Sequence, residues 1–315
     1  GITDPFLRKI LEEKKGETVV SNIIRSIQLN QNAIIEYPFE DSFVVQGCAG
    51  SGKTMIMLHR LANMLYNRKN MDLSKIKIIT PNSQFNFFID ALSKNLGIEK
   101  IQKCTMAEYY ISILQKYRSF NLDSVPATRP VKNAAGFYVD EEYIKKIESG
   151  PTRHEEYNRL TEDSFYNTNT LVYLYSKEAV ESVVSKAQME RGKKNTKHDY
   201  GTVVQNFLDV LNEIFVSLGE TTRYSNSHKT CEAILFLEVE YLYAYYGKTI
   251  STDTMLCIDE GQELSVLQYE LFRKINGEKL VMNIYGDLAQ HTSKTKGVFK
   301  WNNINGYSNN KYFVL

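Results

Sequence analysis

The segment from Gly47 to Thr54 reads "GCAGSGKT", and it constrains the fold of this 315-residue chain more than any other feature. It matches the pattern G-x-x-x-x-G-K-[S/T], follows the apolar run "SFVVQ" and precedes the helical pattern "KTMIMLHRLANMLYN". A strand, a glycine-rich loop and a helix in this order direct backbone N–H groups and the positive helix end toward phosphate oxygens. The alternative is a glycine-rich turn with an exposed lysine, and the strand and helix on either side argue against it.

The residue types in this loop suit the parts of a bound nucleotide. Lys53 would neutralise the β- and γ-phosphates, and the hydroxyl of Thr54 would be a ligand of Mg²⁺. We therefore expect ATP and Mg²⁺ as cofactors. The residues expected to contact the nucleotide here are Gly47, Ala49, Gly50, Ser51, Gly52, Lys53 and Thr54.

Two acidic residues follow a second apolar run, "MLCI", in the C-terminal part of the chain. In open parallel sheets, ligands bind at the carboxyl ends of the strands, so Asp259 and Glu260 should face the nucleotide. We expect Asp259 to hold Mg²⁺, mostly through water, and Glu260 to orient and deprotonate an attacking water. An exposed acidic pair is the alternative, and the position directly after a buried strand favours the metal site.

A third run, "LVMNIYGDLAQ", ends in a Gly-Asp turn and Gln290. The neutral amide of Gln290 could reach a γ-phosphate and respond to its loss, so we assign it a catalytic role. A surface turn containing a glutamine is the alternative that these residues leave open.

The apolar runs that end at these polar residues are continuous rather than alternating. This pattern, which also occurs in "KIKIIT", favours a parallel sheet covered by helices on both faces. The fold class expected is therefore α/β. Residues 109–230 differ, because polar loops alternate with helical stretches such as "VVQNFLDVLNEIFVSLG", and we interpret them as a mostly helical insertion.

Composition excludes several classes of protein. Four cysteines without a C-x-x-C pair indicate reduced thiols rather than disulfides or a zinc site. Because no apolar run approaches about 18 residues, we expect no membrane span and a cytoplasmic location. The net charge of +1 neither requires nor excludes a nucleic-acid partner, for which a local basic patch matters more.

Taken in order, Gln31, "AGSGKT", "IITPNSQF", "IDEGQ" and "YGDLAQ" resemble the first motor domain of superfamily 1 helicases of the UvrD/Rep class. The surrounding segments are similar to the helicase IV or HelD-like branch. The resemblance implies a RecA-like P-loop NTPase fold and ATP hydrolysis coupled to movement on nucleic acid. It makes Gln31, 22 residues before Lys53, the residue that reads adenine, and it adds Gln262 and Asp287 to the nucleotide-binding set.

The resemblance also implies a domain organisation. Residues 1–108 and 231–315 would form a discontinuous RecA-like domain, 1A, and residues 109–230 an inserted subdomain, 1B. In this family a second RecA-like domain, 2A, follows and supplies arginines to the ATP site. We therefore expect the chain to be a fragment of a larger motor that binds adenine nucleotide weakly and hydrolyses it barely.

Partners are where the sequence leaves alternatives open. The resemblance places Thr80, Asn82, Phe85 and Thr105 where relatives touch single-stranded DNA, although Phe85 also fits the apolar face of its helix. Because the HelD-like branch includes RNA-polymerase-associated ATPases, a recycling factor that remodels transcription complexes without unwinding DNA is the second hypothesis. A conventional DNA helicase of repair or phage defence is the third. Cys48, Gly261 and Glu263 depart from residues common in relatives.

Overall fold

The computed structural model describes residues 30–68, 71–117, 130–132, 138–140, 168–193, 200–219, 231–304 and 312–315. Residues 1–29 lie outside these ranges. The first described residues, 30–35, are helical and include Gln31 and Ile35. No helix within the described part is long and apolar enough to cross a membrane.

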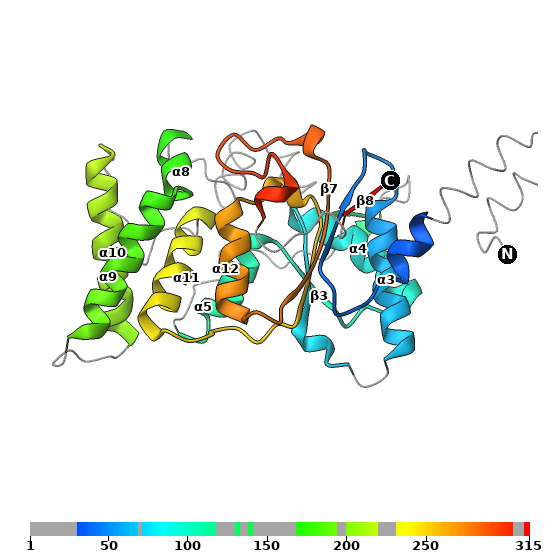
Figure 1. Cartoon of the computed structure of the whole chain (residues 1–315), viewed down its shortest axis with the longest axis horizontal. Coiled ribbons are helices and arrows are strands. Elements are labelled where there is room, and N and C mark those ends of the chain that lie inside the picture. Colours follow the sequence, from blue (N-terminus) through cyan, green and yellow to red (C-terminus); the bar gives the residue numbers. More distant parts are fainter. Residues whose placement is uncertain are drawn as a thin grey trace, which may run out of the picture.

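A six-stranded sheet forms the centre of the molecule, and all of its strands run parallel in the order β3-β2-β6-β7-β1-β8 (Figure 1). The α/β class predicted from the continuous apolar runs is therefore confirmed. The strands are β1 (Phe43–Gln46), β2 (Ile76–Ile79), β3 (Gln102–Cys104), β6 (Met255–Ile258), β7 (Val281–Gly286) and β8 (Tyr312–Val314).

Helices cover both faces of this sheet, and alternate strand residues supply the two cores. Phe43 and Val45 of β1 belong to one apolar cluster, whereas Val44 between them belongs to the other. The first cluster includes residues of α3 (Lys53–Asn67) and α4 (Ser83–Leu96). On the opposite face lie α5 (Met106–Leu114), α11 (Glu232–Tyr246) and α12 (Val266–Asn276) (Figure 1).

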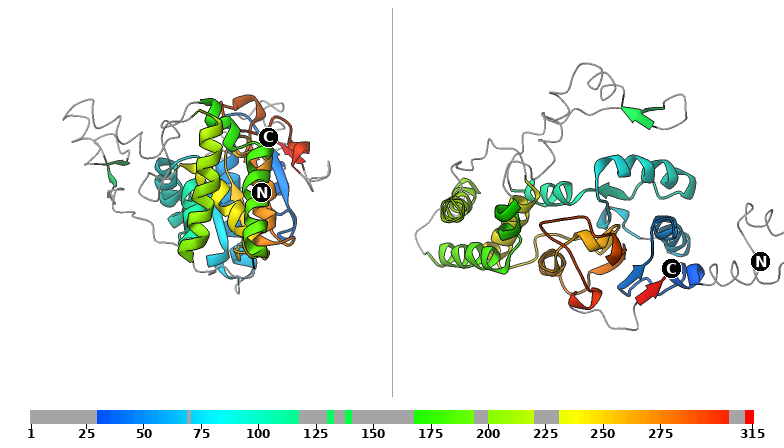
Figure 2. Two further views of the ribbon diagram at one scale, coloured as in Figure 1. Left: turned by 90° about the vertical axis from the view of Figure 1, so that its left-hand side faces the viewer. Right: turned by 90° about the horizontal axis from the view of Figure 1, so that it is seen from above.

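A further helical layer lies outside α11. It consists of α8 (Thr168–Leu174), α9 (Lys177–Gly192) and α10 (Tyr200–Ser217), and α9 packs against both α10 and α11 (Figure 2). Because α11 contacts α5 and α12 on one side and α8 and α9 on the other, twelve of its fifteen residues are buried. The described parts of 109–230 are thus mainly helical, with one antiparallel pair, β4 (Pro130–Lys132) and β5 (Tyr138–Asp140).

The structure contains two sheet strands, β3 and β8, that were not predicted. Sequence reading missed β3 and β8, because three-residue strands carry too short an apolar pattern to separate from a loop. The end "KYFVL" supplies β8, whose Tyr312 pairs with Val44 at the edge of the sheet. The boundary predicted between residues 108 and 109 falls inside α5, and the division into 1A and 1B stays a prediction.

Short 3₁₀ turns follow several strands at the edge that carries the polar residues. They are η3 (Gly261–Glu263) after β6, η4 (Leu288–Gln290) after β7 and η5 (Trp301–Asn303) farther on, while η1 (Leu73–Lys75) precedes β2. The sheet therefore brings the ends of β1, β6 and β7 together, since these three strands are neighbours in the order given above.

Candidate nucleotide-binding site

The glycine-rich loop connects β1 to α3 as predicted, and it closes around its lysine. Lys53 is the first residue of α3 and only 7% exposed. Its Nζ donates hydrogen bonds to the carbonyl oxygens of Gly47, at 2.7 Å, and Cys48, at 3.2 Å. These bonds hold the ammonium group at the mouth of the loop, where a phosphate oxygen could replace a carbonyl as its acceptor.

The loop conformation depends on its glycines. Gly50 and Gly52 have φ values of 75° and 86°, in the left-handed region that other residues rarely adopt. A Cβ atom at Gly47 would lie 2.5 Å from the hydroxyl of Ser51, so this position cannot hold a side chain without rearrangement. The Ser51 hydroxyl is buried and has no hydrogen-bond partner among the residues that the structure describes. An unpaired donor inside a cradle of this kind fits an anionic oxygen.

Thr54 and Asp259 are in direct contact next to the phosphate loop. The Thr54 hydroxyl donates a 2.8 Å hydrogen bond to Oδ2 of Asp259, which is 4% exposed. Burial raises the pKa of Asp259 to about 6, the charge of Glu260 adds to the rise, and the bond from Thr54 opposes it. The described residues contain no group of three His, Cys, Asp or Glu side chains suited to a metal. Two oxygen ligands completed by phosphate and water are nevertheless the usual protein contribution to a Mg²⁺–nucleotide site.

Glu260 occupies an unusual backbone conformation. Among the described residues it is the one non-glycine residue with positive φ, at φ 50° and ψ 42°. Its Oε2 accepts a 2.7 Å hydrogen bond from Nε2 of Gln262. Non-glycine residues in this left-handed conformation are strained, and surrounding contacts must hold them there. Such residues are concentrated at functional sites.

Hydrogen bonds continue from Glu260 to Gln290. The buried amide of Gln262 donates to Glu260 and accepts a 3.0 Å bond from the backbone N–H of Asp287. Asp287 in turn accepts a 2.5 Å bond from Nε2 of Gln290. The structure thus brings together all the residues predicted at the ends of β6 and β7.

Sequence reading missed Gln46 at the end of β1. Its Nε2 donates to Asp287 at 2.6 Å, and its Oε1 accepts from Trp301 at 2.8 Å. Although burial opposes ionisation of Asp287, hydrogen bonds from Ala289, Gln290 and Gln46 hold its pKa below the ordinary value. A polar residue directly before the glycine-rich loop was the available signal.

Gln31 lies beside the phosphate loop. Its Nε2 is 3.9 Å from the position that a Cβ of Gly52 would take. The residue predicted to read adenine is therefore placed next to the start of α3, although Lys53 lies 22 positions farther along the chain.

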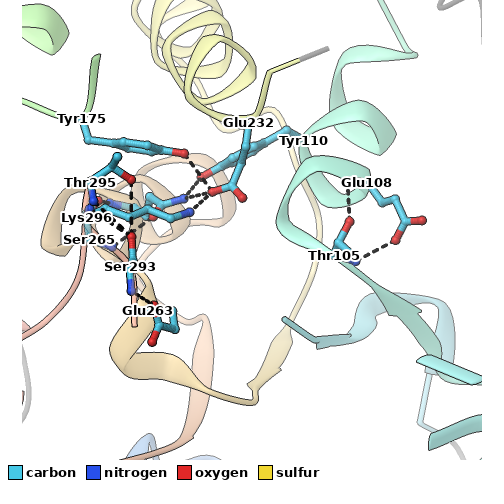
Figure 3. A network of polar contacts seen from close by, with 11 residues as sticks. Thr105, Glu108, Tyr110, Tyr175, Glu232, Glu263, Ser265, Ser293, Thr295 and Lys296 are labelled. Atoms are coloured by element: carbon cyan, nitrogen blue, oxygen red, sulfur yellow. Dashed lines mark hydrogen bonds and ion pairs between the residues drawn. The ribbon is translucent and has the colours of Figure 1, made fainter. Parts of the chain in front are cut away.

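The four residues predicted to contact nucleic acid have internal roles. The Asn82 side chain caps α4 by accepting from the N–H of Phe85 at 2.9 Å, and Phe85 packs against the core beneath α4. Thr105 forms a capping box with Glu108 at the start of α5 (Figure 3). Thr80 is buried, with its hydroxyl bonded to Asn86. Contact with DNA stays a prediction for all four.

The segment after Gln290 is tied to the rest of the molecule at two points (Figure 3). Glu263 accepts hydrogen bonds from the backbone N–H groups of Thr292, at 2.7 Å, and Ser293, at 2.8 Å. Farther on, Lys296 pairs with Glu232 at the start of α11. The carboxylate of Glu263 therefore holds the start of this segment against η3.

Comparison with known proteins agrees with this geometry. The model of the UvrD/REP helicase N-terminal domain matches residues 27–292, which span the phosphate loop, the acidic pair and Gln290. No curated protein matches the chain. Because the matched region covers most of the chain and contains every strand end that builds the site, the chain belongs to the UvrD/REP helicase N-terminal domain family.

Proposed function

We propose that the chain is the ATP-binding motor domain of a HelD-like superfamily 1 ATPase that couples ATP hydrolysis to translocation on nucleic acid or its unwinding. One observation supports this most strongly. The hydroxyl of Thr54, next to Lys53 at the start of α3, donates to the carboxylate of Asp259 from a distant segment of the sequence, and this contact supports a site for phosphate and Mg²⁺. A family of ATP-driven helicase motors supplies the reaction class.

Each side chain has a role that its contacts support. When the nucleotide binds, Lys53 donates its hydrogen bonds to phosphate oxygens instead of loop carbonyls. The buried hydroxyl of Ser51 donates to a further phosphate oxygen. Thr54 and Asp259 would hold Mg²⁺, which withdraws negative charge from the phosphates. Glu260 accepts the proton of the attacking water, with its carboxylate oriented by Gln262.

Gln290 is the residue proposed to respond to the γ-phosphate. Its amide is held by Asp287, which is itself fixed by Gln46 and by the side chain of Gln262. Loss of a phosphate contact at Gln290 would therefore change the position of Glu260, because Asp287 and Gln262 link the two side chains by hydrogen bonds.

The proposal includes domain 2A of the same parent protein as the source of arginines that complete the site. Such an arginine is worth about 10³ to 10⁵ in rate. Residues 1–315 alone should then bind adenine nucleotide weakly and hydrolyse it slowly. Hydrolysis at the rate of a complete motor would contradict this part of the proposal.

A second candidate is an RNA-polymerase recycling factor that does not unwind DNA. The observation in its favour is the outer helical layer, where Met189 of α9 and Val216 of α10 are each 66% exposed. Exposed apolar side chains suit a protein surface better than a phosphate backbone. Stimulation of ATPase activity in the parent protein, by single-stranded DNA and separately by RNA polymerase, distinguishes the two.

Nucleotide binding itself is tested by Lys53→Ala. Titration calorimetry with Mg²⁺–ATP should show binding to the wild-type chain and none to this variant. Lys177→Ala is the matched control, because Lys177 is an exposed lysine near the start of α9. Equal affinity in Lys53→Ala and Lys177→Ala would overturn the proposed site.

A further inference from the structure

Arg60 is a fully buried arginine on the helix that begins at the phosphate loop. It lies on α3, seven residues after Lys53, and is 1% exposed. Its guanidinium donates to four backbone carbonyl oxygens of one short segment. The acceptors, with their distances, are Ile34 at 3.0 Å, Ile35 at 3.3 Å, Tyr37 at 2.6 Å and Pro38 at 2.9 Å.

The carbonyls of Ile34 and Ile35 belong to the end of the helical segment that carries Gln31, and those of Tyr37 and Pro38 follow directly after it. The last carbonyl groups of a helix have no partner within the helix, and a cation there satisfies them and interacts favourably with the helix dipole. The rings of Phe39 and Phe43 also lie 5.1 and 4.8 Å from the guanidinium carbon of Arg60. Within the described part of the chain, the hydrogen-bond partners of this guanidinium are backbone carbonyls, and its other close contacts are the two rings.

The contacts of Arg60 fix one helix end relative to α3. Gln31 lies one helical turn before Ile34 and Ile35. The side-chain amide of Gln31 lies beside Gly52, the residue directly before α3. Consequently α3 carries both Lys53, in the phosphate loop, and the arginine that contacts the segment around the end of the Gln31 helix. Asn63, one turn after Arg60, adds a 3.3 Å bond from its Nδ2 to the carbonyl oxygen of Ile35.

We propose that Arg60 is a positioning residue for base selection, which aligns the Gln31 amide with the edge of a bound adenine by holding the end of its helix against α3. This inference rests on the proposed function, in which Gln31 reads the base. A residue that served stability alone would change the affinities for adenine and guanine nucleotides equally. A positioning residue changes their ratio, because the guanine edge presents a different set of donors and acceptors.

The test compares dissociation constants for ATP and GTP, measured with Mg²⁺ by titration calorimetry, in the wild type and in Gln31→Ala and Arg60→Lys. Lysine keeps the charge of Arg60 but cannot span four carbonyls, so Arg60→Lys should lower the ATP/GTP selectivity roughly tenfold. The matched control is Arg68→Lys, since Arg68 ends the same helix on the surface, next to Glu40. The control should keep the wild-type selectivity.

Asn63→Ala keeps the inference testable if Arg60→Lys does not fold. Removal of the single bond to Ile35 should reduce selectivity by a smaller factor, and the double variant Gln31→Ala/Arg60→Lys should match Gln31→Ala alone. Selectivity that falls in Gln31→Ala but stays at the wild-type value in Arg60→Lys and Asn63→Ala would overturn the role of Arg60. Unchanged selectivity in Gln31→Ala would instead overturn the proposed role of Gln31.

Discussion

Thr54 and Asp259 are separated by 205 positions in the sequence, yet the hydroxyl of Thr54 lies 2.8 Å from the carboxylate of Asp259. The sheet explains the contact, because only β7 lies between β1, which leads to Thr54, and β6, which leads to Asp259. The intervening chain includes α4, α5 and the outer helices α8, α9 and α10. A long insertion at a surface connection adds little closure entropy, so the site tolerates this distance along the chain.

Removing this hydroxyl should affect both stability and metal dependence. Thr54→Val keeps the shape of the side chain but leaves the buried Oδ2 of Asp259 without its donor. We expect the free energy of unfolding to fall by about 1–3 kcal/mol without nucleotide, measured by urea denaturation. The affinity for ATP should also become insensitive to Mg²⁺. Thr54→Ser retains the hydroxyl and should behave like the wild type in both measurements, and a loss equal to that of Thr54→Val would contradict the role assigned to the hydroxyl.

The cysteines offer a direct probe of the phosphate loop. Cys48 is exposed within the loop, whereas Cys104, Cys231 and Cys257 are buried, and burial raises the pKa of the Cys104 and Cys257 thiols to about 12. Because the thiolate is the reactive form, iodoacetamide at pH 7.5 should modify Cys48 first.

Mg²⁺–ATP should slow this reaction, since phosphates in the loop would cover Cys48. Mass spectrometry of the peptide containing Cys48 measures the rate, and the Lys53→Ala variant is the control that should lose the protection. A rate at Cys48 that ATP leaves unchanged in the wild type would show that the nucleotide binds elsewhere.

Local patterns were enough to predict much of the fold and the site. The strands β1, β6 and β7 and the helix α3 are marked by apolar runs next to glycines or acids, and β2 by the apolar run "KIKIIT", which are signals within a few residues. Stacking these strands in parallel was then sufficient to bring Thr54, Asp259 and Gln290 to the same edge. The composition change after residue 108 predicted a mostly helical insertion; α9 and α10 lie within the described part of residues 109–230, and the insertion itself stays a prediction.

Contacts between distant segments were not predictable in this way. The role of Gln46 depends on Asp287, 241 positions away, and that of Arg60 on carbonyl groups of another helix. For Thr105, however, the sequence held a signal, because Thr105 and Glu108 match the capping-box pattern.

The backbone at Glu260 gives a prediction about stability and activity together. A left-handed conformation costs a residue with a Cβ atom about 1–2 kcal/mol, and glycine avoids this cost. Glu260→Gly should therefore have a free energy of unfolding about 1 kcal/mol above that of Glu260→Ala, although both lose the carboxylate and the bond to Gln262. Both variants should lack ATPase activity in the parent protein. Equal stability of the two variants in thermal denaturation would show that position 260 is not strained.

Two glutamates of α11 should respond to pH in opposite directions. Glu232 is surrounded by donors: burial disfavours its charge, but Lys296, Gln268 and Tyr175 outweigh burial and lower its pKa from 4.5. Glu240 has Lys274 as its ionic partner, at 2.9 Å, and burial raises its pKa from 4.5 despite that partner.

The sign of each contribution follows from linkage. A lowered pKa means that the ionised Glu232 stabilises the fold above its unfolded pKa, and this stabilisation is lost as pH falls through the folded value. A raised pKa means that the fold prefers protonated Glu240, so stability is lost as pH rises from the unfolded pKa through the folded one. The two windows lie on opposite sides of pH 4.5.

Urea denaturation of Glu232→Gln and Glu240→Gln against the wild type, at intervals from pH 3.5 to pH 7, tests these signs. Glutamine keeps the shape of each side chain but cannot titrate, so each difference isolates one carboxyl group. The wild type should lose its advantage over Glu232→Gln as pH falls below about 4.5, because Lys296 then faces a neutral acid. The wild type should instead become less stable relative to Glu240→Gln as pH rises above about 4.5. Parallel curves for the two variants would show that the donors around Glu232 do not outweigh its burial.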